Sequence, residues 1–171
     1  KSRNQKILFI FDEPTTGLDP QTRKNVWEIV DRLRIEENMT VFLTTHYMEE
    51  ASEADYVVIL DADNLVSSDY LEQVNRYLQA IPCQALQTHR TAKNLNTTTA
   101  VLDAAIEEMN NTLFRLGHVQ LGFSSALIGS GMVLSYPWFA ENIFYTHSAG
   151  EDKELEELLL RQRIRIHYAD S

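Results

Sequence analysis

The chain's strongest constraint on its fold is a series of short apolar runs that alternate with helix-like stretches. The runs at 7–11, 40–44 and 56–60 are mainly apolar and rich in β-branched or aromatic residues. Such runs are typical of strands that are buried on both faces, as in a parallel sheet covered by helices. We therefore expect an α/β fold in which a mostly parallel, Rossmann-like sheet is flanked by helices.

The stretches between the first three strands predict helices. Asp19 followed by Pro20 is typical of a helix N-cap and first turn. Apolar residues then recur at helical spacing, namely Val26, Ile29, Val30 and Leu33. A short helix is expected at 47–54. The predicted order is β-α-β-α-β, with connections long enough to join parallel strands.

The rest of the chain predicts three more helices and three more strands. The helices run from Ser67 or Ser68 to about Pro82, from Thr97 or Thr98 to Gly117, and over 151–162; the strands cover 84–88, 127–134 and 164–168. The second of these helices carries apolar residues on one face, namely Leu102, Ala105, Ile106, Met109, Leu113 and Leu116. This spacing is typical of an amphipathic helix.

Composition excludes several classes of function. The formal net charge is −10, and no segment is rich in Lys or Arg, so nucleic acid is not an expected partner. Cys83 is the single cysteine, which fits a reducing compartment, excludes a structural zinc site and predicts a small packed side chain. Without a bilayer-length apolar run or a signal peptide, we expect a soluble cytoplasmic protein.

Two acids follow the first predicted strand in "ILFIFDEPTTGLDP", where α/β sheets place ligand chemistry. This segment resembles the Walker B strand and D-loop of ATP-binding-cassette ATPases, and "TVFLTTHYMEEASEADYVVIL" resembles their switch-histidine region. The resemblance covers positions 6–60. It implies that Asp12 holds Mg²⁺ through water, Glu13 polarises the attacking water, Asp19 communicates across a dimer, and His46 touches the γ-phosphate.

ATP hydrolysis by this chain is nevertheless not expected. That chemistry needs a G-x-x-x-x-G-K-[ST] phosphate cradle, and none of the six glycines is followed by lysine. The family's signature loop is also missing, and the abrupt start of the chain suggests missing upstream sequence. The simplest alternative for the two acids is that they end a strand, with Pro14 stopping the pairing.

A second pair of acids follows the third predicted strand in "DADN". Residues i and i+2 of an extended segment point to one face, so Asp61 and Asp63 can lie together. Such a pair can hold Mg²⁺ or Mn²⁺, which takes one or two carboxylates plus phosphate oxygens. The alternative is a solvated turn with an Asx hydrogen bond.

The sequence around this pair strengthens the first interpretation. "DADNLVSSDYLEQVNRYL", "SSALIGSGMVLSYPWF" and "GEDKELEELLLRQRIRIHYAD" resemble the catalytic half of inverting, GT-A-type family 2 glycosyltransferases, over positions 55–171. The resemblance implies that Asp61 and Asp63 meet the metal and the nucleotide diphosphate. It implies that the loop of Gly129, Ser130 and Gly131 borders the donor sugar and the acceptor. It also implies that Glu151 and Asp152 are the pair whose aspartate is the catalytic base.

Inverting transfer needs these pieces. One carboxylate takes the proton from the acceptor hydroxyl, and a separate positive charge stabilises the departing diphosphate. Asp152 would be the carboxylate that takes the proton, and the metal on Asp61 and Asp63 would supply the positive charge. Glycines let backbone approach a sugar closely. The alternative for Glu151 and Asp152 is that their charges oppose a helix dipole in its first turn.

The two resemblances meet at the strand 54–60. We expect a single α/β domain of composite origin, GT-A/Rossmann-like and incomplete at both ends, with an ATPase-like half at 1–60 and a glycosyltransferase-like half at 55–171. Three hypotheses follow: a glycosyltransferase moving a sugar from a nucleotide-sugar to a saccharide or lipid-linked acceptor, an ATP-binding fragment of a transporter, or an inactive recombined chain. We favour the first, because its metal pair and base are present. The parent protein is expected at the inner face of a membrane.

Overall fold

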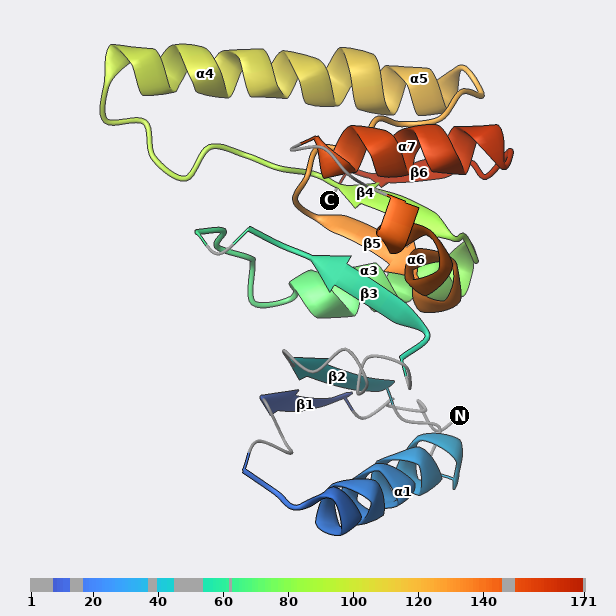
Figure 1. Ribbon diagram of the computed structural model, residues 1–171. Helices are drawn as coiled ribbons and strands as arrows, with labels where there is room; N and C mark the ends of the chain where they lie inside the picture. Colours follow the sequence, from blue (N-terminus) through green and yellow to red (C-terminus); the bar gives the residue numbers. More distant parts are fainter. Residues whose placement is uncertain are drawn as a thin grey trace, which may run out of the picture. The chain divides into compact units, whose positions relative to one another are not determined.

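The computed structural model describes residues 8–12, 17–36, 40–44, 54–61, 63–145 and 150–170. The chain divides into two compact units, Lys1–Glu53 and Ala54–Ser171, and each is considered by itself (Figure 1). Over the described ranges, every helix is too short or too polar to cross a lipid bilayer. The short helix expected at 47–54 lies outside the described residues, except for its last position.

The first unit contains two parallel strands and one helix. Strand β1 (Leu8–Asp12) pairs with β2 (Thr40–Thr44), with Leu8 opposite Thr40 and Asp12 opposite Thr44. Helix α1 (Pro20–Glu36) connects them, and Val30 is its buried residue. The predicted β-α-β arrangement is confirmed for these elements. A helical crossover is the usual way to join adjacent parallel strands.

Asp19 caps helix α1, as its position before Pro20 predicted. Its Oδ1 accepts hydrogen bonds from the backbone N–H groups of Gln21 (3.0 Å) and Thr22 (3.1 Å). The Thr22 hydroxyl donates to Oδ2 at 2.5 Å. The Thr22 hydroxyl, together with these backbone groups, lowers the pKa of the Asp19 carboxyl below 3.8. The carboxylate thus satisfies donors that the first helical turn leaves unpaired.

The second unit alternates strands and helices. Its strands are β3 (Tyr56–Ile59), β4 (Ala85–Thr88), β5 (Met132–Ser135) and β6 (Ile166–Ala169). Its helices are α3 (Tyr70–Ala80), α4 (Thr98–Met109), the π-helical η1 (Asn110–Leu116), α5 (Gly117–Gln120), α6 (Tyr136–Asn142), the 3₁₀ turn η2 (Ile143–Tyr145) and α7 (Glu151–Arg161). The strand expected over 127–134 begins only at Met132.

The four strands of this unit form one mixed sheet in the order β3-β5-β4-β6. β5 is antiparallel to both neighbours, whereas β4 and β6 are parallel. The α/β class with a helix-flanked sheet is confirmed. The difference concerns β3, which pairs with antiparallel β5 instead of extending the parallel pair of the first unit. An apolar run reports burial on both faces of a strand, and it does not determine the strand's direction.

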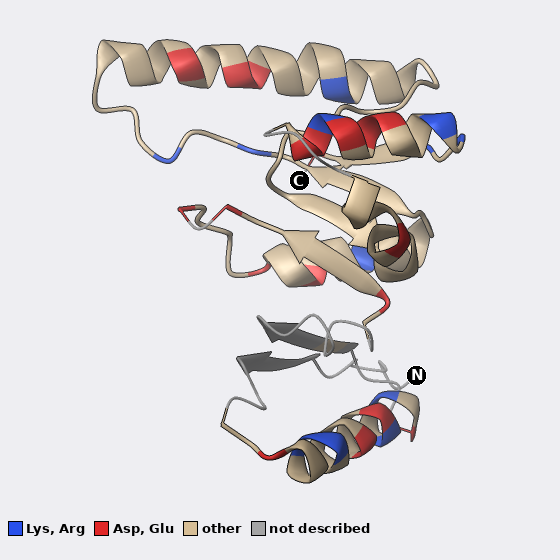
Figure 2. Cartoon of the chain, in the orientation of Figure 1, with Lys and Arg blue, Asp and Glu red and all other residues tan. Residues whose placement is uncertain are grey.

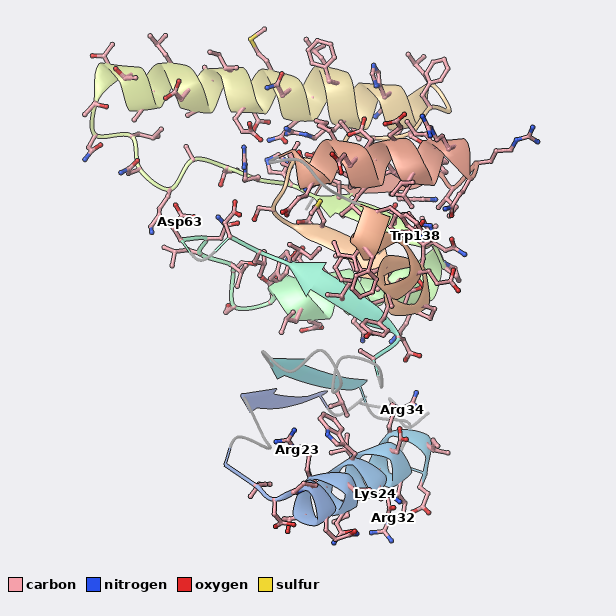
Figure 3. All side chains as sticks on the ribbon, viewed as in Figure 1. Arg23, Lys24, Arg32, Arg34, Asp63 and Trp138 are labelled. Carbon is pink, nitrogen blue, oxygen red and sulfur yellow. The ribbon has the colours of Figure 1, made fainter. Side chains whose placement is uncertain are left out.

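Each face of the sheet is covered by helices. Successive residues of β5 point to opposite faces, with Met132 and Leu134 on one and Val133 on the other. The first face packs against Leu155 and Leu159 of α7 and against Trp138 and Phe139 of α6 (Figure 3). The second packs against Val74 of α3. The sheet is thus the middle of three layers.

Helices α4, η1 and α5 run on without a break over 98–120. Thr97 is the N-cap as predicted, and its Oγ1 accepts from the backbone N–H of Ala100 at 3.1 Å. The prediction that Gly117 ends the helix is wrong, because Gly117 is helical with φ −59°. The chain turns instead at Gly122, where φ is +90°. A glycine ends a helix when it adopts the left-handed conformation, and its presence alone does not show this.

This long helix is turned opposite to the usual amphipathic orientation. Its apolar residues Leu102, Ile106 and Met109 are each more than half exposed, while Asn111 and Arg115 are buried. Figure 3 shows side chains projecting from the helix on the side away from α7. Polar contacts to the sheet, described below, therefore hold this helix in place.

Cys83 should react slowly in the folded protein. Burial raises the pKa of its thiol to about 11 from 9.0, so the thiolate fraction at pH 8 falls about a hundredfold. We expect alkylation by iodoacetamide, followed by mass spectrometry, to be slower by about that factor in the native than in the urea-unfolded chain. Equal rates would contradict this placement of the side chain.

Candidate functional site

The directions of the strands bring several strand ends to one edge of the four-stranded sheet. β3 and β4 are both antiparallel to β5, so they run in the same direction, and β6 is parallel to β4. The carboxyl ends of β3, β4 and β6 therefore lie at the same edge as the amino end of β5 (Figure 1). We call this the carboxyl edge. Its described residues are 60, 61, 63, 64, 89–93 and 170, together with 129–131.

At the carboxyl edge, the turn after β3 is bound to the loop before β5. The backbone N–H of Asn64 donates to the carbonyl of Asp61 at 3.0 Å and closes the turn. The backbone N–H of Asp61 donates to Oγ of the buried Ser130 at 3.1 Å, and that hydroxyl donates to Oδ1 of Asn64. The structure thus brings two of the predicted segments together. Asp61 and Asp63 are exposed, with Asp63 near the end of the turn (Figure 3).

The loop before β5 is fixed by the fully buried side chain of Gln87. Its Nε2 donates to the carbonyls of Ser130 (2.8 Å) and Gly131 (3.3 Å). Its Oε1 accepts from the backbone N–H of Ile128 at 3.1 Å. The backbone N–H of Gly131 donates to Ile59 of β3 at 2.8 Å. Both strands that flank the loop therefore help to set its shape.

The two glycines of this loop have different surroundings. Both adopt positive φ, +76° at Gly129 and +68° at Gly131, a region that favours glycine. A Cβ at Gly131 would lie 2.4 Å from Oγ1 of Thr88, whereas a Cβ at Gly129 would meet nothing within 4 Å. At Gly131 the close approach is thus to the protein itself. Contact of this loop with a sugar stays a prediction.

Glu151 and Asp152 occupy the first turn of α7. Figure 2 shows the concentration of acidic residues along this helix. The helix is tied to Leu127, whose carbonyl accepts from Lys153 Nζ at 2.6 Å and whose N–H donates to Glu156 Oε2 at 2.9 Å. Leu127 lies two residues before the glycine loop, so α7 is anchored beside that loop. The position suits both a catalytic base and a helix-dipole role.

The donor set for a cation is small. Across the described ranges, no group of three or more His, Cys, Asp or Glu side chains is placed to hold a metal ion. Ala62, which separates Asp61 from Asp63, lies outside those ranges. A pair of carboxylates still fits Mg²⁺ or Mn²⁺ when phosphate oxygens complete the coordination. The metal role of the pair stays a prediction.

A polar cluster around His89 was not predicted from the sequence. His89 follows β4, and its Nδ1 lies 2.9 Å from the Tyr168 hydroxyl and 3.3 Å from Oδ1 of Asp170. Its Nε2 lies 3.4 Å from Oε2 of Glu108 on α4. Burial raises the pKa of Tyr168 to about 12. The available signal was the position of His89 after a predicted strand, but its partners are remote in sequence.

A second unpredicted cluster fixes the long helix to the sheet. Arg115 and Arg90 donate to the two carboxylate oxygens of Glu107, at 2.9 Å and 3.3 Å. Asn111 donates to the carbonyl of Arg90 at 2.8 Å and accepts from Arg115. Burial by itself would raise the pKa of Glu107, but the hydrogen bond from Arg90 and the charge of Arg115 lower it below 4.5. The carboxylate therefore stays charged at neutral pH.

The residues of the ATPase-like site are only partly described. Asp12 is the last residue of β1, and its side chain lies outside the described part. Glu13 and His46 also lie outside it. Asp19 caps α1 through Gln21 and Thr22. Communication by Asp19 across a dimer stays a prediction.

Comparison with known proteins gives two kinds of match. A family model described as "Glycosyl transferase family group 2" matches residues 56–171. Relatives of the other kind include the energy-coupling factor transporter ATP-binding protein EcfA2 of Enterococcus faecalis, which is 41% identical over 39% of this chain and 24% of the relative. The EcfA1 protein of Clostridioides difficile is 56% identical over 30% of this chain and 19% of its own length.

A third relative aligns over more of the chain. The Nod factor export ATP-binding protein I of Cupriavidus metallidurans is 32% identical over 145 residues, which is 82% of this chain and 47% of the relative. That alignment is longer than the 55 residues preceding the family match, so the two similarities overlap. The chain spans less than half the length of these relatives. Both resemblances predicted from the sequence are confirmed.

Substitutions at the two glycines test the geometry of the loop. Gly129→Ala should destabilise the chain by about 1 kcal/mol, the cost of a left-handed alanine. Gly131→Ala should cost about 2–4 kcal/mol, because the clash with Thr88 adds to that strain. Urea denaturation followed by circular dichroism measures both. Equal losses of stability would show that Thr88 does not crowd Gly131.

Proposed function

Because the chain belongs to glycosyl transferase family group 2, we propose that it is an inverting glycosyltransferase. It would move a sugar from a nucleotide-sugar donor to a hydroxyl of a saccharide or lipid-linked acceptor. The observation that carries the proposal is the bond between two segments at the carboxyl edge. Ser130 joins the turn that bears Asp61 and Asp63 to the loop before β5. Open α/β sheets bind ligands at the carboxyl ends of their strands.

In this proposal, Asp61 and Asp63 would hold Mg²⁺ or Mn²⁺, the ion that helps to bind the donor diphosphate. The bound cation would neutralise charge on the departing diphosphate. Both carboxylates are exposed at the turn, so they can reach a ligand that arrives from solvent. The Asp61 backbone is held by Ser130, which keeps the turn in place.

Asp152 is the proposed base. It would accept the proton of the acceptor hydroxyl while that oxygen bonds to the anomeric carbon and the bond to the diphosphate breaks. Asp152 is half-buried and Glu151 is exposed, which favours Asp152 as the group that faces the substrate. Lys153 is bound to Leu127 and Glu156, and it keeps the first turn of α7 beside the glycine loop.

A second candidate function is favoured by the ATP-binding relatives. In that case the chain would be part of a transporter's ATP-binding subunit, and Asp12, Glu13, Asp19 and His46 would belong to its nucleotide site. The sequence lacks the phosphate cradle that this site needs. A third candidate is an inactive chain that combines pieces of both families. In either active case we propose a cytoplasmic location, at the inner face of a membrane in the parent protein.

Ligand binding separates the three candidates. With Mn²⁺ present, we expect UDP or GDP to bind in isothermal titration calorimetry, and Asp63→Asn should weaken that binding at least about tenfold because a metal ligand is lost. Asp103→Asn, an exposed aspartate on α4, is the matched control and should change nothing. Binding of ATP with Mg²⁺ instead would favour the transporter candidate. Binding of neither nucleotide would favour the inactive chain.

The base is tested separately from the metal pair. Asp152→Asn should retain nucleoside diphosphate binding and lower sugar transfer by about a hundredfold or more, since a general base contributes at least that much. Release of nucleoside diphosphate from a panel of nucleotide-sugars measures the transfer. Glu151→Gln is the control and should keep most activity. The reverse pattern would assign the base to Glu151.

A further inference from the structure

A cavity of about 740 Å³ opens at the edge of the sheet opposite the carboxyl edge. Arg163 and Arg165, which line it, lie just before the amino end of β6. Figure 1 shows α5 and α7 ending on this side of the second unit. The volume lies in the range of sites that enclose small organic ligands, about 300–1,000 Å³. We call this cavity the arginine cavity.

One wall of the arginine cavity is aromatic. The ring of His118 makes edge contacts with the rings of Phe114 and Phe123, with centroid distances of 6.1 and 6.3 Å. Both phenylalanines are more than half exposed, and Leu160 beside them is nearly half exposed. Apolar side chains that gather in one exposed hollow are typical of a binding surface. This wall suits the apolar part of a ligand.

The cavity also has a positively charged part, formed by Arg163 and Arg165, although the net charge of the chain is −10. Arg165 donates from one Nη to the carbonyl of Val119 at 2.8 Å, which holds its guanidinium beside α5. Among residues 54–61, 63–145 and 150–170, neither Arg163 nor Arg165 forms a salt bridge. Glu156 also lines the cavity, but its Oε2 is bound by Lys153 and Leu127. The cavity therefore favours an anion.

Arg163 also occupies a strained backbone position. Helix α7 ends with the two hydrogen bonds of a Schellman motif, from Arg163 N to the Leu160 carbonyl (3.0 Å) and from Ile164 N to the Leu159 carbonyl (2.9 Å). Arg163 adopts φ +59°, a left-handed conformation that favours glycine. Arginine here costs stability and places a guanidinium at the cavity. Such strain is often found at ligand-binding positions.

We propose that the arginine cavity binds a phosphate monoester that carries an apolar body. The apolar body would lie against Phe114 and Phe123, and the phosphate would accept hydrogen bonds from Arg163 and Arg165. Guanidinium groups match phosphate oxygens in charge and geometry. The cavity and the carboxyl edge are at opposite ends of β6, so the proposal does not depend on the glycosyltransferase function.

Titration of the full chain with octyl phosphate by isothermal titration calorimetry tests the ligand class. Octanol and inorganic phosphate are its two halves, and each should bind at least about tenfold more weakly, because each loses one wall of contacts. Binding of octanol as tight as that of octyl phosphate would overturn the proposal, since the arginines would take no part. Equal binding of inorganic phosphate would overturn it as well, since the aromatic wall would take no part.

Variants locate the site and separate binding from folding. Arg163→Gly removes the guanidinium and relieves the left-handed strain, so it should raise the thermal midpoint while octyl phosphate binds about tenfold more weakly. The control is Arg161→Gln, because Arg161 pairs with Glu157 at 2.6 Å outside the cavity. That variant should bind as the parent does. Unchanged binding by Arg163→Gly, or an equal loss in the control, would overturn the proposal.

Two further measurements complete the test. Phe123→Ala should weaken octyl phosphate binding and leave inorganic phosphate binding unchanged; an unchanged affinity for octyl phosphate would contradict the aromatic wall.

Phosphatidylcholine vesicles that contain phosphatidic acid present the same monoester from a bilayer. Binding to these vesicles that depends on Arg163 would identify a lipid as the source of the ligand, and binding of octyl phosphate alone would identify a soluble ester.

Discussion

The carboxamide of Gln87 determines the shape of the loop before β5, because it pairs with backbone groups of Ile128, Ser130 and Gly131 at once. An apolar side chain of similar size would remove the partner of the Ser130 carbonyl and of the Ile128 N–H, at a cost of about 1–3 kcal/mol for a buried group, whereas the Gly131 carbonyl would keep its hydrogen bonds from Thr88. The hydroxyl of Ser130 carries the constraint on to the turn after β3. One buried amide thus connects the interior of the sheet with the surface where Asp61 and Asp63 lie.

The central position of β5 makes this connection possible. Because β5 is antiparallel to β3 and β4, its amino end meets their carboxyl ends, and residues about 70 positions apart in sequence become neighbours. The polar turn at 61–64 and the glycines at 129–131 were identified from sequence as candidate site segments. Their contact could not be predicted, since an apolar strand pattern leaves the direction of the strand undetermined.

Local signals in the sequence were more informative than long-range ones. The caps at Asp19 and Thr97 follow from side chains that reach nearby backbone N–H groups, so a few residues of sequence were enough. The orientation of the helix 98–120 was not predictable in this way. Its inward face is polar, and a pattern of polar residues alone indicates solvent. Only the folded chain brings Arg90 to Glu107, and the turn that bears Asp61 and Asp63 to the loop before β5.

The charged contacts that hold this helix make its attachment sensitive to ionic strength. The helix is held to the residues after β4 partly by the charged pair of Glu107 and Arg90, whereas the sheet itself packs through apolar side chains such as Leu86 and Leu134. Dissolved ions screen partly exposed charges and leave apolar burial largely intact. Rising ionic strength should therefore weaken the Arg90–Glu107 pair before it affects the packing of the sheet, while the buried Asn111 continues to hold the helix.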